Sequence, residues 1–139
     1  MVEKKFTHCA LKIKGNMNLV YTAMSKHLFY YRMHISKFVI EEVRVPLNPF
    51  MIFDYFLLDS VERDFVRKAN NSIVLKADEI WVFGDISNGV LSEILIAQEV
   101  KKTIKYFKIE KPHNIVPINI MDIKMENEVK DCKHLIFSS

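Results

Sequence analysis

The chain has 139 residues, which is enough to bury a hydrophobic core as one domain. Its formal net charge of +3 is small and spread along the chain, so a nucleic-acid polymer is not expected as a partner. Hydrophobic residues make up 50% of the sequence, yet no apolar run approaches the roughly 18 residues of a membrane span, which excludes a membrane partner of that kind.

The ends of the chain give an expectation about its compartment. The first residues, MVEKKFTH, are charged and lack the apolar core of a signal peptide, so we expect a cytoplasmic protein. Cys9 and Cys132 lie near opposite ends without CxxC spacing, a pattern typical of reduced thiols rather than of a disulfide framework or a zinc site.

The N-terminal part of the chain alternates predicted strands and helices. Partial alternation over residues 5–13 indicates an edge strand, and the β-branched and aromatic run 19–23 indicates the first strand of a parallel sheet. Apolar residues at helical spacing predict a helix over 29–42, and a short strand is predicted over 43–47.

An aromatic segment and a second helix precede the centre of the chain. Residues 50–58 are rich in aromatic side chains and are predicted to form a short helix that covers the ligand site described below. Asp59 and Ser60 are typical helix-capping residues, and apolar side chains at helical spacing predict a helix over 61–73.

The central stretch, residues 77–106, has the order strand, turn, helix, strand. The apolar run 80–83 predicts a buried strand, and the turn 85–89 carries the small polar residues that cap helices. A helix follows, and residues 103–107 indicate another strand. Such a βαβ unit builds a parallel sheet, and open α/β sheets bind ligands at the carboxyl ends of their strands. The turn is therefore the expected place of a ligand site.

The C-terminal part completes the expected fold. Residues 115–120 indicate a further strand, and residues 134–137 a final edge strand. The charged stretch 122–133 is ambiguous. We expect a single α/β domain over 1–139. It has three layers, with a mostly parallel five-stranded, Rossmann-like or flavodoxin-like sheet, helices on both faces and an extra edge strand near a terminus.

Two features of the central turn and helix are candidates for chemistry. Ser87, Asn88 and Gly89 stand at a helix start, where free N–H groups can hold a phosphate or a sugar hydroxyl; plain helix capping is the alternative. Glu93 follows one helical turn later, either as a catalytic carboxylate or as an acidic residue that the helix dipole favours.

Several short motifs carry a resemblance that covers residues 21–107. They comprise Ala77-Asp78 at the central strand, followed by Ser87-x-Gly89-x-x-x-Glu93-x-x-x-Ala97. Two further elements are Tyr21 in the first strand with Ser25 and His27 just after it, and the pair Arg63-Asp64. This set resembles the nucleoside 2-deoxyribosyltransferase-like superfamily, which includes deoxyribosyltransferases and 2′-deoxynucleoside 5′-monophosphate N-glycosidases. The strings P-L-N-P-F and A-D-E-I-W-V-F-G look closer still to an uncharacterised bacterial and phage branch.

The resemblance implies catalytic roles for three side chains. Glu93 would be the nucleophile that attacks the anomeric carbon of a 2-deoxyribosyl group. Asp64 would bind or protonate the leaving base. An equal alternative is that Asp64 is an exposed residue that pairs with Arg67 or Lys68 on the same helix. Tyr21 would hold the carboxylate or the sugar, with a plain core position as the alternative.

The resemblance also implies substrate contacts. Ser25 and Ser87 would contact a 5′-phosphate or 5′-hydroxyl, and a serine at position 87 favours a phosphorylated ligand. The first loop departs from the phosphate-clasping sequence of the hydrolases: His27 stands at their arginine position, and Lys26 or Arg32 are possible substitutes.

The expected function follows from these implied roles. It is cleavage or transfer at the N-glycosidic bond of a 2′-deoxynucleoside or its 5′-monophosphate, without a metal or an organic cofactor. The alternative is a nucleotide-binding module without turnover, which the altered first loop favours. The resemblance further implies a homodimer or larger homo-oligomer, with residues 50–58 as the candidate interface.

Overall fold

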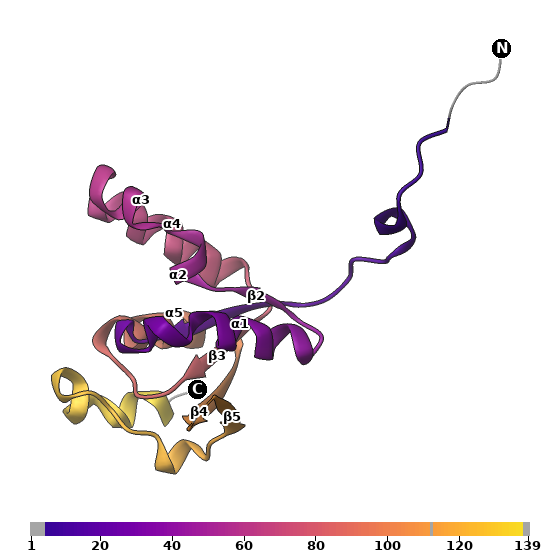
Figure 1. The fold of residues 1–139 in the computed structure, drawn as a ribbon. Coiled ribbons are helices and arrows are strands. Elements are labelled where there is room, and N and C mark those ends of the chain that lie inside the picture. Colours follow the sequence, from indigo (N-terminus) through magenta and orange to yellow (C-terminus); the bar gives the residue numbers. More distant parts are fainter. Residues whose placement is uncertain (1–4, 112, 138–139) are drawn as a thin grey trace.

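The computed structural model describes residues 5–111 and 113–137; residues 1–4 of the charged N-terminal segment lie outside the described part. A five-stranded sheet with the order β2-β1-β3-β4-β5 forms its centre (Figure 1). The strands are β1 (Leu19–Met24), β2 (Val45–Leu47), β3 (Glu79–Phe83), β4 (Thr103–Glu110) and β5 (Asn114–Pro117). The first four pair in parallel, and β5 pairs with β4 in antiparallel orientation.

Helices connect the strands and cover the sheet. The α-helices are α1 (Arg32–Glu41), α2 (Pro49–Ile52), α3 (Tyr55–Ser60), α4 (Arg63–Lys76) and α5 (Asn88–Glu99). The 3₁₀ helices are η1 (Cys9–Lys12), η2 (Lys26–Tyr31), η3 (Ile120–Asp122) and η4 (Asn127–Phe137). Among residues 5–111 and 113–137, no helix has the length and apolar character needed to cross a lipid bilayer.

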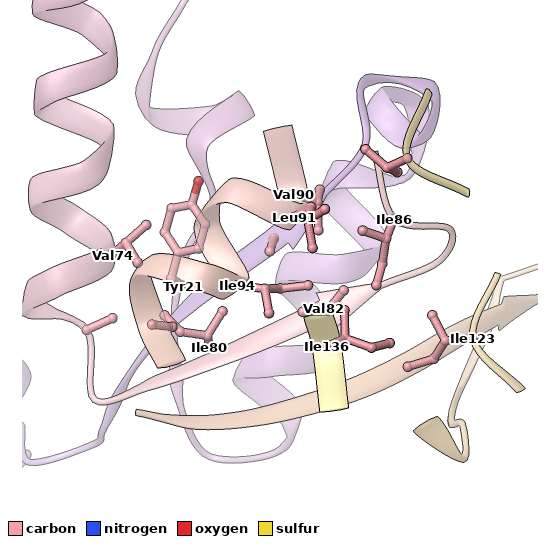
Figure 2. Close-up of a cluster of buried hydrophobic side chains, with 14 residues drawn as sticks. Tyr21, Val74, Ile80, Val82, Ile86, Val90, Leu91, Ile94, Ile123 and Ile136 are labelled. Atoms are coloured by element: carbon pink, nitrogen blue, oxygen red, sulfur yellow. The ribbon is translucent and has the colours of Figure 1, made fainter. Parts of the chain in front are cut away.

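Two hydrophobic clusters lie on opposite faces of the sheet, because successive side chains of a strand alternate between its faces. On one face, Tyr21 and Ala23 of β1 pack with side chains of α4, α5 and η4 (Figure 2). On the other face, Val20 and Met24 pack with Ile35 of α1 and with aromatic side chains of β3 and β4. This three-layer arrangement confirms the predicted α/β class with a mostly parallel sheet.

The central βαβ unit forms as its residues predict. All five residues of β3 are buried, which explains its continuous apolar run. Gly84 ends the strand with a φ of +75°, a value that glycine adopts without steric cost. Ser87 then caps α5, because its Oγ accepts a hydrogen bond from the backbone N–H of Val90 at 3.2 Å.

Both terminal edge-strand predictions are wrong, and β5 is the antiparallel edge strand instead. Residues 5–13 contain η1 and are exposed, since the nearby sheet edge is the three-residue β2, in which Pro46 lacks an N–H donor. Residues 134–137 belong to η4, where the Gln98 amide of α5 donates to the carbonyl oxygens of Leu135 and Ile136 at 3.1 and 3.3 Å.

The cap predicted at Asp59 and Ser60 is also wrong. Both residues belong to the last turn of α3, and α4 begins four residues after Asp59, with Glu62 at its N-cap. The aromatic segment 50–58 contains two short helices, because Asn48 and Asp54 each accept a backbone hydrogen bond at a separate helix start.

Candidate functional site

A cavity of about 560 Å³ opens beside the carboxyl end of β1. Its walls come from β1, η2, α2, α3, α4 and α5. Phe50 and Phe53 of the aromatic segment provide an apolar wall, and Gly89 and Glu93 contribute from the first turns of α5. The position agrees with the general rule that open α/β sheets bind ligands at the carboxyl ends of their strands.

Three side chains from three different elements meet at the floor of this cavity. The Tyr21 hydroxyl of β1 donates a hydrogen bond to Glu93 Oε2 of α5. The Asn70 amide nitrogen of α4 donates to the same carboxylate oxygen at 2.8 Å, and Asn70 Oδ1 lies 3.0 Å from the Tyr21 hydroxyl. Figure 2 shows the Tyr21 ring in the core with its oxygen directed away from the aliphatic cluster. Glu93 is therefore fixed by two donors, neither of which carries a positive charge.

Burial controls the protonation of this cluster. It raises the pKa of Glu93 from its ordinary value of 4.5 to about 7, and the hydrogen bonds from Tyr21 and Asn70 oppose that rise. Burial also raises the pKa of Tyr21 well above 10, and the negative charge of Glu93 adds to this effect. Tyr21 consequently remains a hydrogen-bond donor at neutral pH, whereas Glu93 holds its proton to a higher pH than an ordinary glutamate does.

Positive charge surrounds the cavity. Lys26 of η2 and both Arg63 and Arg67 of α4 line it, and Glu93 is the one carboxylate among the described residues that do so. Three cations around a single carboxylate favour an anionic ligand, and arginine suits phosphate because its planar fork can bind two oxygens at once. The cavity combines this basic rim with an aromatic wall and a carboxylate floor.

The structure brings only part of the predicted site together. Tyr21, Gly89 and Glu93 line the same cavity, in agreement with the motif that suggested them. Ser87 caps α5 and Asn88 is exposed at its first position, and neither is among the residues that line the cavity.

Ser25 and His27 line a second cavity, of about 670 Å³, between the loops after β1 and β3 and the start of η4. Ser25 Oγ accepts a hydrogen bond from the backbone N–H of His27 at 3.3 Å and so caps η2. The imidazole of His27 is exposed, with Nε2 3.8 Å from a carboxylate oxygen of Glu126.

Asp64 does not line the cavity in this structure. Its side chain is 80% exposed and pairs with Arg67 one turn later, Nη1 to Oδ1 at 3.1 Å. This is the exposed helix pair that the sequence offered as the alternative to a catalytic role.

Asn70 is the residue that the sequence analysis missed. Arg63, Arg67 and Asn70 stand at positions i, i+4 and i+7 of α4, which places them on one face of the helix. A polar stripe on a helix that precedes the central strand is the signal that identifies them. The apolar side chains at helical spacing predict the helix itself, but they do not single out Asn70.

Within the part of the chain that the structure describes, no group of three or more His, Cys, Asp or Glu side chains is arranged to hold a metal ion.

Comparison with known proteins assigns the chain to a family. The family model described as "Domain of unknown function (DUF7768)" matches residues 17–107, and the chain belongs to this family. No curated protein matches it. Among solved structures, it is similar to a 2-desoxiribosyltransferase from Leishmania mexicana, with 14% identity and a TM-score of 0.49 over 88% of this chain and 99% of that one.

Proposed function

We propose that this member of the DUF7768 family cleaves or transfers the N-glycosidic bond of a 2′-deoxynucleoside 5′-monophosphate, or of the deoxynucleoside, with Glu93 as nucleophile. The observation that carries the proposal is the carboxylate of Glu93, held by Tyr21 and Asn70 at the floor of a cavity with an aromatic wall. The residue motif around Glu93, described above, supports the same chemistry.

The environment of Glu93 suits a carboxylate nucleophile. A carboxylate stabilises the positive charge that develops on the sugar and then bonds to its anomeric carbon. Neutral donors orient the carboxylate without neutralising its charge. Burial raises the pKa of Glu93, which means that the carboxylate is already poorly solvated and loses little solvation when a sugar covers it. Tyr21 and Asn70 hold the carboxylate in place through Oε2, which lowers the entropic cost of reaching the transition state.

The basic rim favours the phosphorylated substrate. A phosphate in the cavity would be opposed by one carboxylate and attracted by Lys26, Arg63 and Arg67. The wall formed by Phe50 and Phe53 gives the base an aromatic surface on which to stack.

A second candidate function is nucleotide binding without turnover. It is supported by the absence of a second carboxyl group among the described residues that line the cavity, because glycosidases generally use one carboxyl to protonate the leaving group. In this case the same rim would bind the phosphate, and Glu93 would accept a hydrogen bond from the sugar.

Base release and binding, measured side by side, separate the two functions. Wild type and Glu93→Ala are incubated with deoxynucleosides and their monophosphates, free base is measured by chromatography, and affinity is measured by calorimetry. Release by wild type alone supports the enzyme. Binding without release in both proteins supports the binding module, and neither binding nor release contradicts both.

The basic rim is tested by a matched pair on α4. Arg67→Ala should lower the affinity for the monophosphate at least tenfold more than the affinity for the nucleoside. Lys68 is exposed and does not line the cavity, so Lys68→Ala should not have this effect. Equal losses for both variants would show that general charge, not the rim, attracts the ligand.

A further inference from the structure

Among the exposed large apolar side chains of the described residues, several lie close together in two segments. The first is the N-terminal arm, residues 5–18, in which Phe6, Leu11 and Ile13 are 77%, 70% and 74% exposed. The second is the α2–α3 surface, residues 49–62, in which Tyr55 and Phe56 are 64% and 73% exposed. Exposed apolar patches of this kind mark interaction sites in proteins that remain soluble.

The two segments carry opposite charge. The N-terminal arm contains three lysines, Lys5, Lys12 and Lys14, and no acidic residue. The α2–α3 surface contains three exposed carboxylates, Asp54, Asp59 and Glu62, and no basic residue. Both segments therefore expose apolar area, and each carries the charge that the other lacks. Complementary charge favours the pairing of one surface with the other.

The position of the segments in the fold separates them within one molecule. The arm enters β1 at its amino end, at Leu19, whereas α2 follows the carboxyl end of the parallel neighbour β2. In Figure 1 the arm runs away from the sheet in one direction and α3 projects in another. The family match begins at residue 17, so nearly all of the arm precedes the matched domain.

We propose that the N-terminal arm of one molecule packs on the α2–α3 surface of a second copy, and that the exchange is reciprocal in a symmetric dimer. In such a dimer, each molecule gives one arm and receives one, so the contact closes on itself. The contact buries the apolar side chains of the arm, Phe6, Leu11 and Ile13, against Tyr55 and Phe56. The lysines of the arm then face the carboxylates of the α2–α3 surface. Arm exchange goes beyond the catalytic proposal and does not depend on it.

The dimer has a consequence for the cavity. Phe53 and Leu58, which belong to the α2–α3 surface, line the cavity that contains Glu93. The arm of the second copy would pack on the outer side of α2 and α3 and so stabilise the wall that these helices give the cavity.

Charge reversal and its reciprocal rescue test the pairing. Lys12→Glu with Lys14→Glu reverses the arm, and Asp59→Lys with Glu62→Lys reverses the surface while Asp54, which caps α3, is kept. Sedimentation velocity measures the dimer dissociation constant at low ionic strength, and circular dichroism checks that each variant folds. Each reversal should raise the constant by about tenfold or more, and the combination of both should restore it.

The control for net charge reverses two exposed lysines elsewhere, Lys124→Glu with Lys130→Glu, and should leave the dimer intact. A monomeric wild type, a dimer that ignores the arm reversal, or a combined variant that fails to recover would each overturn the proposal.

A crosslink determines whether the arm binds a second copy or folds back on its own molecule. Cys9 lies in the exposed arm, and Phe56→Cys places a thiol on the α2–α3 surface. Oxidation should then give a covalent dimer on a non-reducing gel, and Cys9→Ser in the same background should abolish it. A bridge within one chain, seen as a monomer of altered mobility, would overturn the exchange.

Discussion

The raised pKa of Glu93 predicts that its replacement by glutamine stabilises the protein in alkaline solution. In the folded protein this carboxyl has a pKa of about 7, against 4.5 as its ordinary value, so the folded state holds the proton more tightly than the unfolded state does. Stability must then fall as the pH rises from 4.5 to 7, because the unfolded state gives up its proton first. Glutamine keeps the shape of the side chain and never ionises.

The size of the effect follows from the shift. A pKa difference of this size corresponds to about 3 kcal/mol in the free energy of unfolding. Because the carboxylate borders an open cavity, solvent screening reduces the expected gain in stability of Glu93→Gln to about 2 kcal/mol. For a chain of this length, the melting temperature of Glu93→Gln at pH 8 should exceed that of wild type by about 6 °C.

Thermal unfolding of both proteins at pH 4.5 and pH 8 measures this difference. The two melting temperatures should coincide at the lower pH and separate at the higher one, while Glu93→Gln loses base release. A variant that is less stable than wild type at both pH values would refute the reasoning, because it would show that Glu93 is a structural hydrogen-bonding residue.

The remaining predictions concern the donor to Glu93, the pH profile and the turn after β3. Tyr21→Phe removes a hydrogen bond that lowers the pKa of Glu93, so the pH at which kcat/KM reaches half its maximum should move above that of wild type; an unchanged profile contradicts the assignment. In wild type, kcat/KM should rise with pH through about 7, because the nucleophile must be ionised; a fall over this range contradicts it. Gly84→Ala should cost about 1–2 kcal/mol in chemical denaturation, since alanine is strained at a φ of +75° and its Cβ would lie 2.7 Å from Leu28 Cδ1, whereas Gly15→Ala, in open space, should cost nothing measurable.

Much of the fold was predictable because its signals are local. The buried run of β3, the break at Gly84 and the cap at Ser87 each follow from a few adjacent residues, and all three form as predicted. The two terminal edge strands could not be excluded in the same way. Whether a short apolar segment becomes a strand depends on a free sheet edge, and that is a property of the whole fold.

The candidate site was predictable only where one motif contained it. Glu93 and Gly89 belong to one helical motif, and the structure places both in the cavity with Tyr21. Asn70 was missed because it contacts Glu93 from a different helix, at a separation of 23 residues in the sequence, and local spacing does not reveal such a contact. The loop with Ser25 and His27 forms a 3₁₀ helix that turns these residues toward the second cavity.

The central claim, that Glu93 attacks the sugar, is tested most directly by trapping the covalent intermediate. Wild type is mixed with a deoxynucleoside monophosphate, quenched in acid within seconds and analysed by intact-protein and peptide mass spectrometry. We predict a mass increase equal to one deoxyribosyl 5-phosphate group, located on the peptide that contains Glu93 and absent from Glu93→Gln. Base release without any adduct on that peptide, or an adduct that persists in the variant, would contradict the account.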